Sequence, residues 1–108
     1  MFKRGILTVA LVVAIPVFGV AVAQMNDSSK AFMEVHEKMM KSMMMKPTGN
    51  ADKDFAMMMI PHHQGAIDMA EVELKHGKDP VMKEMAQKII DAQKKEIAEF
   101  KKWQSEHM

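Results

Sequence analysis

The stretch DPVMKEMAQKIIDAQKKEIAEFKKW, residues 79–103, has the clearest periodicity in the chain. Its apolar residues recur at steps of three and four, and lysine and glutamate fill most of the positions between them, which indicates an amphipathic α-helix facing a core. Asp79 supplies a capping side chain and Pro80 suits the first helical turn, so we predict a helix from there to about Glu106. The stripe consists of Met82, Met85, Ala86, Ile89, Ile90, Gln93, Ile97, Phe100 and Trp103.

An earlier helix is predicted from a cap at Asp27 or Ser28 to about Lys46. The turn residues PTGN, 47–50, would end it. A further helix is predicted between these two.

The middle helix is expected to begin near Asp52 or Asp54 and to end at about His76, before a glycine. Pro61 falls inside it, and we expect a kink there because proline lacks the amide hydrogen that a helix uses. The alternative is that the helix begins at Pro61 and that residues 54–60 form a separate turn.

Nothing in the chain has the alternating pattern of a β-strand. The connections between the three predicted helices are about five residues long, and such short links favour antiparallel neighbours. The sequence therefore predicts an all-α fold, a small antiparallel bundle of three main helices.

The N-terminal segment has the features of a secretory signal peptide. Lys3 and Arg4 precede an almost wholly apolar run, and the small-x-small motif at residues 21–23 suits cleavage before Gln24. We expect residues 1–23 to be removed on export, which leaves 24–108 as a single helical metal-binding domain. An uncleaved membrane anchor is the alternative, because the apolar run is just long enough to span a bilayer.

Charge and composition restrict the classes of function. Removal of Lys3 and Arg4 changes the formal net charge from +1 to −1, and a chain so nearly neutral lacks the basic surface that nucleic-acid binding needs. The chain contains no cysteine, so it cannot be stabilised by disulfides as many small exported domains are. We therefore expect oligomerisation, with a homodimer as the simplest case, or a bound ligand to support the fold.

Methionine is abundant, with 15 residues in a chain of 108. In an oxidising compartment a thioether cannot form a disulfide, yet it remains a soft ligand suited to Cu(I). Abundant methionine without cysteine in an exported chain therefore indicates a soft-metal function.

The segment MMMIPHHQGAIDMA, residues 57–70, combines thioethers with imidazoles. On a helix, Met59 lies three residues before His62 and four before His63, the spacings that bring side chains together. Adjacent histidines point apart, so two sites, or one ligand and one supporting donor, both remain open. The candidate metal ligands of this segment are Met58, Met59, His62, His63 and Met69.

The first helix repeats these residue types at steps of three and four. If it packs with the same face toward the middle helix, its sulfur and nitrogen atoms join those of the middle helix. The additional candidate ligands are Met33, His36, Met40, Met43 and Met44.

Other methionines and histidines have simpler interpretations. Met39, Met82 and Met85 are expected in the core, because a methionine on an apolar helix face most often serves packing. His76 is expected to complement the dipole at a helix end, and His107 to lie in a frayed tail.

Motifs of catalysis are incomplete. His36 begins an HExxH pattern, but Met40 occupies the place of the second histidine. Glu73 and His76 form one ExxH motif, whereas a two-iron carboxylate bundle needs two of them and further glutamates. We therefore expect that the protein is not an enzyme.

The segment from Asp54 to Trp103 resembles an exported bacterial family that has been labelled a domain of unknown function, with a ferritin-like helical fold. The resemblance rests on M-I-x-H-H-x-x-A-I-x-M-A, residues 59–70, and A-x-x-I-I-x-x-Q-x-x-E-I, residues 86–97. The family includes the CopM-type methionine-rich periplasmic copper-binding proteins. The resemblance implies copper and silver binding in the periplasm, and it implies as ligands Met59, His62, His63 and Met69.

The sequence thus predicts a periplasmic protein that binds Cu(I), with Cu(II) and Ag(I) as further candidates, and acts in copper sequestration, resistance or transfer. A copper-delivery or efflux protein would be its partner. Two alternatives are a methionine-rich interaction module without a metal and a ferritin-like oxidoreductase.

Overall fold

The computed structural model describes residues 25–108, which form three α-helices without a β-strand. Helix α2 spans Asp27–Ser42, α3 spans Ala51–His76 and α4 spans Pro80–His107. The predicted all-α, three-helix fold is confirmed for this part of the chain. The expected signal peptide and its membrane-anchor alternative lie outside the described residues. Within them, no helix combines the length and apolarity that crossing a membrane requires.

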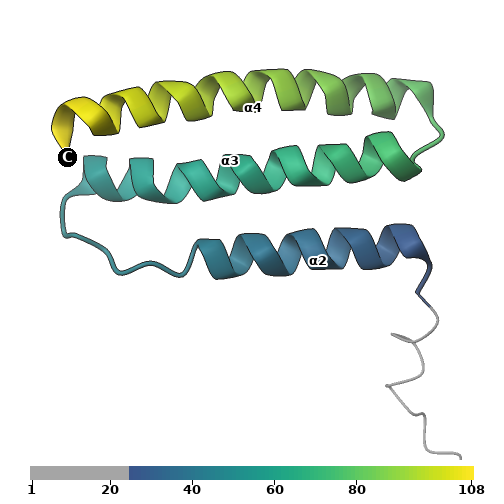
Figure 1. Cartoon of the computed structure of the whole chain (residues 1–108), viewed down its shortest axis with the longest axis horizontal. Helices are drawn as coiled ribbons and strands as arrows, with labels where there is room; N and C mark the ends of the chain where they lie inside the picture. Colours follow the sequence, from purple (N-terminus) through teal and green to yellow (C-terminus); the bar gives the residue numbers. More distant parts are fainter. Residues whose placement is uncertain (1–24) are drawn as a thin grey trace, which may run out of the picture.

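The three helices lie side by side, with α3 in the middle (Figure 1). Helix α3 packs against α2 on one side and against α4 on the other, and α2 and α4 do not pack on each other. Consecutive helices run antiparallel, as the short connections predict. The arrangement is therefore an open layer, which leaves a broad face of α3 uncovered on each side.

Side-chain caps fix where the helices begin. The carboxamide oxygen of Asn26 accepts from the backbone N–H of Ser29 at 2.9 Å, so the cap of α2 is Asn26 and the expectation of Asp27 or Ser28 was wrong. Asp79 caps α4 as predicted and accepts from the N–H of Met82 at 3.0 Å.

Helix α2 ends four residues earlier than predicted. Met43 is the C-cap, and its amide closes the last turn on the carbonyl of Met39 at 3.0 Å. Residues 44–46 leave the helix because the residue before Pro47 disfavours helical backbone, and proline itself cannot donate a helical hydrogen bond. The predicted helical end at Lys46 was therefore wrong.

The connection before α3 is held by the carboxylate of Asp54. It accepts the backbone N–H and the hydroxyl of Thr48, each at 2.7 Å, and the N–H of Gly49 at 3.3 Å. Gly49 has φ of 87°, a conformation that favours glycine. The hydrogen bonds from Thr48 lower the pKa of Asp54 below its usual value.

Helix α3 begins at Ala51, slightly earlier than predicted, and continues through Pro61 to His76. Pro61 therefore does not start the helix, and the alternative of a separate turn at residues 54–60 was wrong. Because Pro61 has no amide hydrogen, the carbonyl of Met57 lacks its usual helical donor. The expected kink at this residue stays a prediction.

The core lies between α3 and α4 and is small. Its buried members are Ile67 and Ala70 of α3 with Ala86, Ile90 and Ile97 of α4. Helix α2 has no buried residue. Most of the packing free energy therefore comes from one helix pair, and α2 is the more weakly held helix.

Two methionines that we predicted in the core are exposed. Met82 and Met85 have 46% and 50% of their surface accessible. Helix α3 covers α4 along Ala86 and Ile90, and no third helix covers the neighbouring stripe that contains both methionines. Met39, which was also expected in the core, is only partly buried, and it lies against Gly65 of α3.

Candidate functional site

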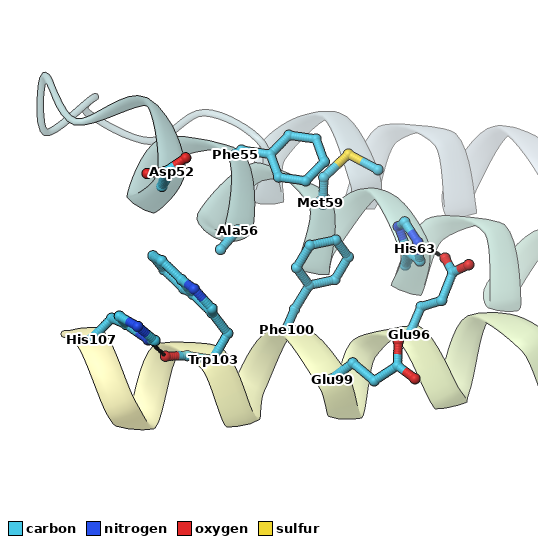
Figure 2. A pocket seen from close by; sticks show the side chains of 10 residues that line it. All are labelled: Asp52, Phe55, Ala56, Met59, His63, Glu96, Glu99, Phe100, Trp103 and His107. Carbon is cyan, nitrogen blue, oxygen red and sulfur yellow. Dashed lines mark hydrogen bonds and ion pairs between the residues drawn. The ribbon is translucent and has the colours of Figure 1, made fainter.

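A groove of about 800 Å³ runs between the first half of α3 and the second half of α4 (Figure 2). Aromatic rings line much of it, together with carboxylates and one thioether, and the side chains of the two helices point toward one another across it. The lining residues are Asp52, Phe55, Ala56, Met59 and His63 of α3 with Glu96, Glu99, Phe100, Trp103 and His107 of α4.

His63 is the one buried polar side chain of the described residues, with 5% of its surface accessible. Its Nε2 contacts the carboxylate of Glu96, which reaches across from α4 (Figure 2). The ring edge of Phe100 packs on the imidazole at 5.5 Å between centroids, and Phe55 packs in the same way on Phe100 at 5.6 Å. The imidazole is therefore held in one orientation by an acceptor and an aromatic neighbour.

The second nitrogen of His63, Nδ1, is buried without a hydrogen-bond partner. A carboxylate at Nε2 places the proton of the neutral imidazole there, which leaves a lone pair on Nδ1. Metal-binding histidines are held in the same manner, with the nitrogen that does not bind the metal donating to a carboxylate. An unsatisfied buried nitrogen is costly, so a bound ligand would relieve it.

Met59 brings a thioether to the same groove. It lies four residues before His63 on α3, so the two side chains are neighbours on the helix surface. The structure thus brings together Met59 and His63 as the sequence predicted, and it adds Glu96 as the residue that orients the imidazole.

His62 lies on a different face of α3. It is exposed, and its ring centroid is 6.2 Å from that of His63, with 59° between the ring planes. The adjacent histidines point apart, as expected, and the groove does not include His62. With about 100° per residue, Met58 and Met69 fall within about 40° of His62 on the helix surface.

Of the candidate ligands in α2, Met33, His36 and Met40 line a second hollow of about 540 Å³ with Met25. Met43 caps the helix, and Met44 follows it with 84% of its surface accessible. The predicted ligands from His36 to Met44 therefore do not all lie on one helix, because Met43 and Met44 follow its last residue. Met25 was missed, because it precedes the predicted helix and has no spacing that would single it out.

The two sides of the helical layer differ in chemistry. On one side, Lys38 of α2 reaches Asp68 of α3 at 3.7 Å, and Glu71 and Lys75 line the same hollow. With about 100° per residue, Glu71 lies about half a turn from His62 on α3. The charged side and the side of His62 are therefore opposite faces of the layer.

We name the second side the thioether face. The groove at Met59 opens on it, and the helical positions of His62 and of the exposed residues of α2 and α4 place them there as well. Its members are Met33, His36 and Met40 of α2, Phe55, Met58, Met59, His62 and Met69 of α3, and Met82, Met85 and Ile89 of α4.

No group of three or more histidine, cysteine, aspartate or glutamate side chains between Met25 and Met108 is placed to hold a metal ion. The thioether sulfurs of the groove and of α2 are the other soft ligand atoms in this part of the chain. Pairing of thioether with imidazole is typical of sites for soft metals such as Cu(I).

His107 and Trp103 form the far end of the groove. The two rings stack at 4.4 Å with 10° between their planes, and Nδ1 of His107 pairs with the carbonyl of Trp103 at 2.7 Å. The expectation that His107 lies in a frayed tail was wrong, because this stack sits inside the last turns of α4. The i, i+4 spacing of the two rings was the available signal.

These features define a class, a small antiparallel three-helix protein with thioethers and imidazoles gathered on one face. Residues 18–104 match the model of the family described as domain of unknown function DUF305, and the chain belongs to this family. No curated protein matches the chain.

Proposed function

We propose that this protein binds a soft metal ion in the periplasm, Cu(I) above all, with Ag(I) and Cu(II) as further candidates. The observation that carries the proposal is the pairing of Met59 with His63, whose Nδ1 is buried and unpaired while Glu96 engages Nε2. A thioether and an oriented imidazole lining one groove match the ligand preference of Cu(I).

The rest of the thioether face supplies further ligands. His62 has Met58 and Met69 beside it on α3, and His36 has Met33 and Met40 beside it on α2. These side chains are exposed, so an ion reaches them without unfolding. An exposed row of weak ligands suits uptake, whereas a buried imidazole suits retention.

Composition supports export to an oxidising compartment. A cysteine there would be liable to oxidation or disulfide exchange, and the chain has none. Thioethers keep their affinity for Cu(I) under these conditions. We therefore propose a role in copper sequestration, resistance or transfer after removal of residues 1–23, with a delivery or efflux protein as partner and without enzymatic turnover. A ferritin-like, CopM-type relationship is part of the same proposal.

A Cu(I) titration against a competing chelator tests the proposal. Met59→Leu keeps the apolar volume and removes the sulfur, so the affinity for Cu(I) should fall. Met57→Leu is the matched control, because Met57 lies two residues away on the same helix and outside the groove. The proposal fails if the protein takes up no metal, and the placement of the site fails if the two variants bind alike.

An interaction module without a metal role is the second candidate. The observation that favours it is the exposure of Phe55, Met82 and Met85 on one face, because methionine surfaces adapt to varied apolar partners. Replacing the methionines of α2 with leucine separates the two functions. Partner binding should then largely survive, whereas soft-metal binding should fall.

A further inference from the structure

The groove between α3 and α4 is larger than a metal ion requires. Its volume of about 800 Å³ is in the range of pockets that enclose small organic molecules. Met59 and His63, the pair proposed to bind the ion, line only part of it, and the groove extends past them to Trp103 and His107 (Figure 2). Space therefore remains for an organic ligand.

The acidic and basic side chains of the groove are unequally represented. Asp52, Glu96 and Glu99 belong to its lining, whereas no lysine or arginine does. Glu96 contacts His63, but neither Asp52 nor Glu99 forms an ion pair within residues 25–108. A cleft lined by charges of one sign concentrates ligands of the opposite sign. The groove therefore favours a cation as its ligand.

Aromatic rings line the groove between its unpaired carboxylates. On α4, Phe100 and Trp103 follow Glu99 and lead toward the end of α3 that contains Asp52 (Figure 2). Phe55 packs on Phe100 from α3 and keeps 57% of its surface accessible. The faces of such rings attract ammonium groups, and apolar side chains of this kind also pack against alkyl chains. Carboxylates and rings together therefore indicate an alkylammonium ligand.

The two unpaired carboxylates are far enough apart to bind the two ends of one molecule. Asp52 precedes His63 on α3 by 11 residues, which corresponds to about 16 Å along the axis. Glu96 of α4 is level with His63, because the two side chains are in contact. Glu99 lies three residues further on, and because α4 runs antiparallel to α3 this brings it about 4.5 Å closer to Asp52. The separation of the two carboxylates along the helices is therefore about 12 Å.

His63 supplies a hydrogen-bond acceptor that also has no partner. Only 5% of its surface is accessible, it lines the groove, and its Nδ1 is unpaired. With the proton of the neutral imidazole on Nε2, facing Glu96, the lone pair on Nδ1 accepts from an ammonium group. The same lone pair belongs to the proposed metal site, so an ammonium group occupies it only in the metal-free protein.

We propose that the metal-free protein binds a linear aliphatic polyamine in this groove. One terminal ammonium group binds Asp52, and the other binds Glu99 and donates to Nδ1 of His63. The alkyl chain and any inner ammonium group lie on the rings of Phe100 and Trp103. A chain of nine single bonds between the terminal nitrogens spans about 11 Å when extended, which matches the separation of the carboxylates.

Titration of spermidine into the metal-free protein tests the proposal. Trp103 is the only tryptophan in the chain, so its fluorescence reports on the groove, and isothermal titration calorimetry measures binding independently. Spermidine has the required nine bonds between its terminal nitrogens, whereas putrescine has five and spans only about 6 Å. We expect saturable binding of spermidine and about fivefold weaker binding of putrescine, which can reach only one of the two carboxylates. Sodium chloride at matched ionic strength controls for screening.

A matched pair of variants locates the ligand. Glu99→Gln removes one carboxylate of the groove and should weaken spermidine binding about fivefold, the value of one exposed charge pair. Spermidine should then lose its advantage over putrescine, because only one of its ends remains bound. Glu84→Gln is the control, since it removes the same charge from an exposed position of α4 outside the groove.

Three results would overturn the proposal. They are the absence of saturable spermidine binding by both methods, equal affinities of the wild-type protein for spermidine and putrescine, and equal weakening by Glu99→Gln and Glu84→Gln. All of these measurements are made without Cu(I), so such a result leaves the proposed metal function standing. A protein that binds spermidine as expected but takes up no Cu(I) contradicts the metal function alone.

Discussion

Glu96 of α4 contacts Nε2 of His63 of α3, and this contact joins two helices through residues that are 33 positions apart in the sequence. It orders the ring that has its other nitrogen buried and unpaired. The contact therefore joins two helices and, in the proposed metal site, also orients the nitrogen that would bind the ion.

Glu96→Gln should weaken Cu(I) binding about tenfold, because the carboxylate that orients a ligating histidine typically contributes at least this much. The measurement is a chelator competition at neutral pH. Glu99→Gln provides the comparison, since Glu99 lines the same groove but the hydrogen bond to His63 comes from Glu96. Equal affinities of the two variants would show that Glu96 does not support metal binding by His63.

Replacement of both histidines, His62→Ala with His63→Ala, should weaken Cu(I) binding at least tenfold, about 1.4 kcal/mol. His62→Ala alone separates the exposed imidazole from the buried one. Circular dichroism should show that both variants keep their helices. Wild-type affinity of the double variant would exclude this part of α3 as the site.

Trp103 is the only tryptophan in the chain, and it lines the groove. Binding of Cu(II) at Met59 and His63 should therefore quench its fluorescence, because the ion and the indole share one cavity. His36→Ala is the control, since His36 lies on α2 outside this groove. Quenching that survives His63→Ala but not His36→Ala would move the site to α2.

Gly65 permits the close approach of α2 to α3. A Cβ at this position would stand 2.6 Å from Cγ and 3.1 Å from Cβ of Met39, so α2 must shift to admit it. Gly65→Ala should lower the free energy of unfolding by about 1 kcal/mol, as overpacking outweighs the gain in helix propensity. In a Met39→Ala background the same substitution should become neutral or stabilising, which chemical denaturation followed by circular dichroism measures.

Asp54 should make the stability of the protein depend on pH in the acid range. The hydrogen bonds from Thr48 lower its pKa in the folded state below the usual 3.8. A lowered pKa contributes stability that is fully present above the unfolded value and is lost as the pH falls through the folded value. Asp54→Asn should therefore flatten the decline in thermal stability below about pH 4. An unchanged decline of stability at acid pH would show that the hydrogen bonds to Asp54 do not contribute.

The helices were largely predictable from local signals. Proline and capping residues fix the start of α4 at Pro80, and the three- and four-residue periodicity fixes its face. The end of α2 was not predictable to the residue, because the apolar spacing continues past Ser42 while the backbone already turns toward Pro47. Periodicity reports the side chains, whereas the helix end depends on the backbone hydrogen bonds.

The candidate site was predictable in part. The proximity of Met59 and His63 was predictable, because residues four positions apart on one helix are neighbours on its surface. Glu96 and Trp103 did not follow, because their place beside α3 depends on the register between two helices. The exposure of Met82 was likewise not predictable from the sequence, because it depends on how many helices surround α4.

The sequence by itself determined the three helices, their antiparallel order and the residue types available to a soft metal, because each depends on interactions within a few residues. Only the tertiary structure decided that the helices form an open layer and that Glu96 engages His63, leaving Nδ1 unpaired. It also decided that Phe55, Met58 and Met69 lie on an uncovered face. These features depend on which helices touch, and that is fixed by packing between segments distant in the chain.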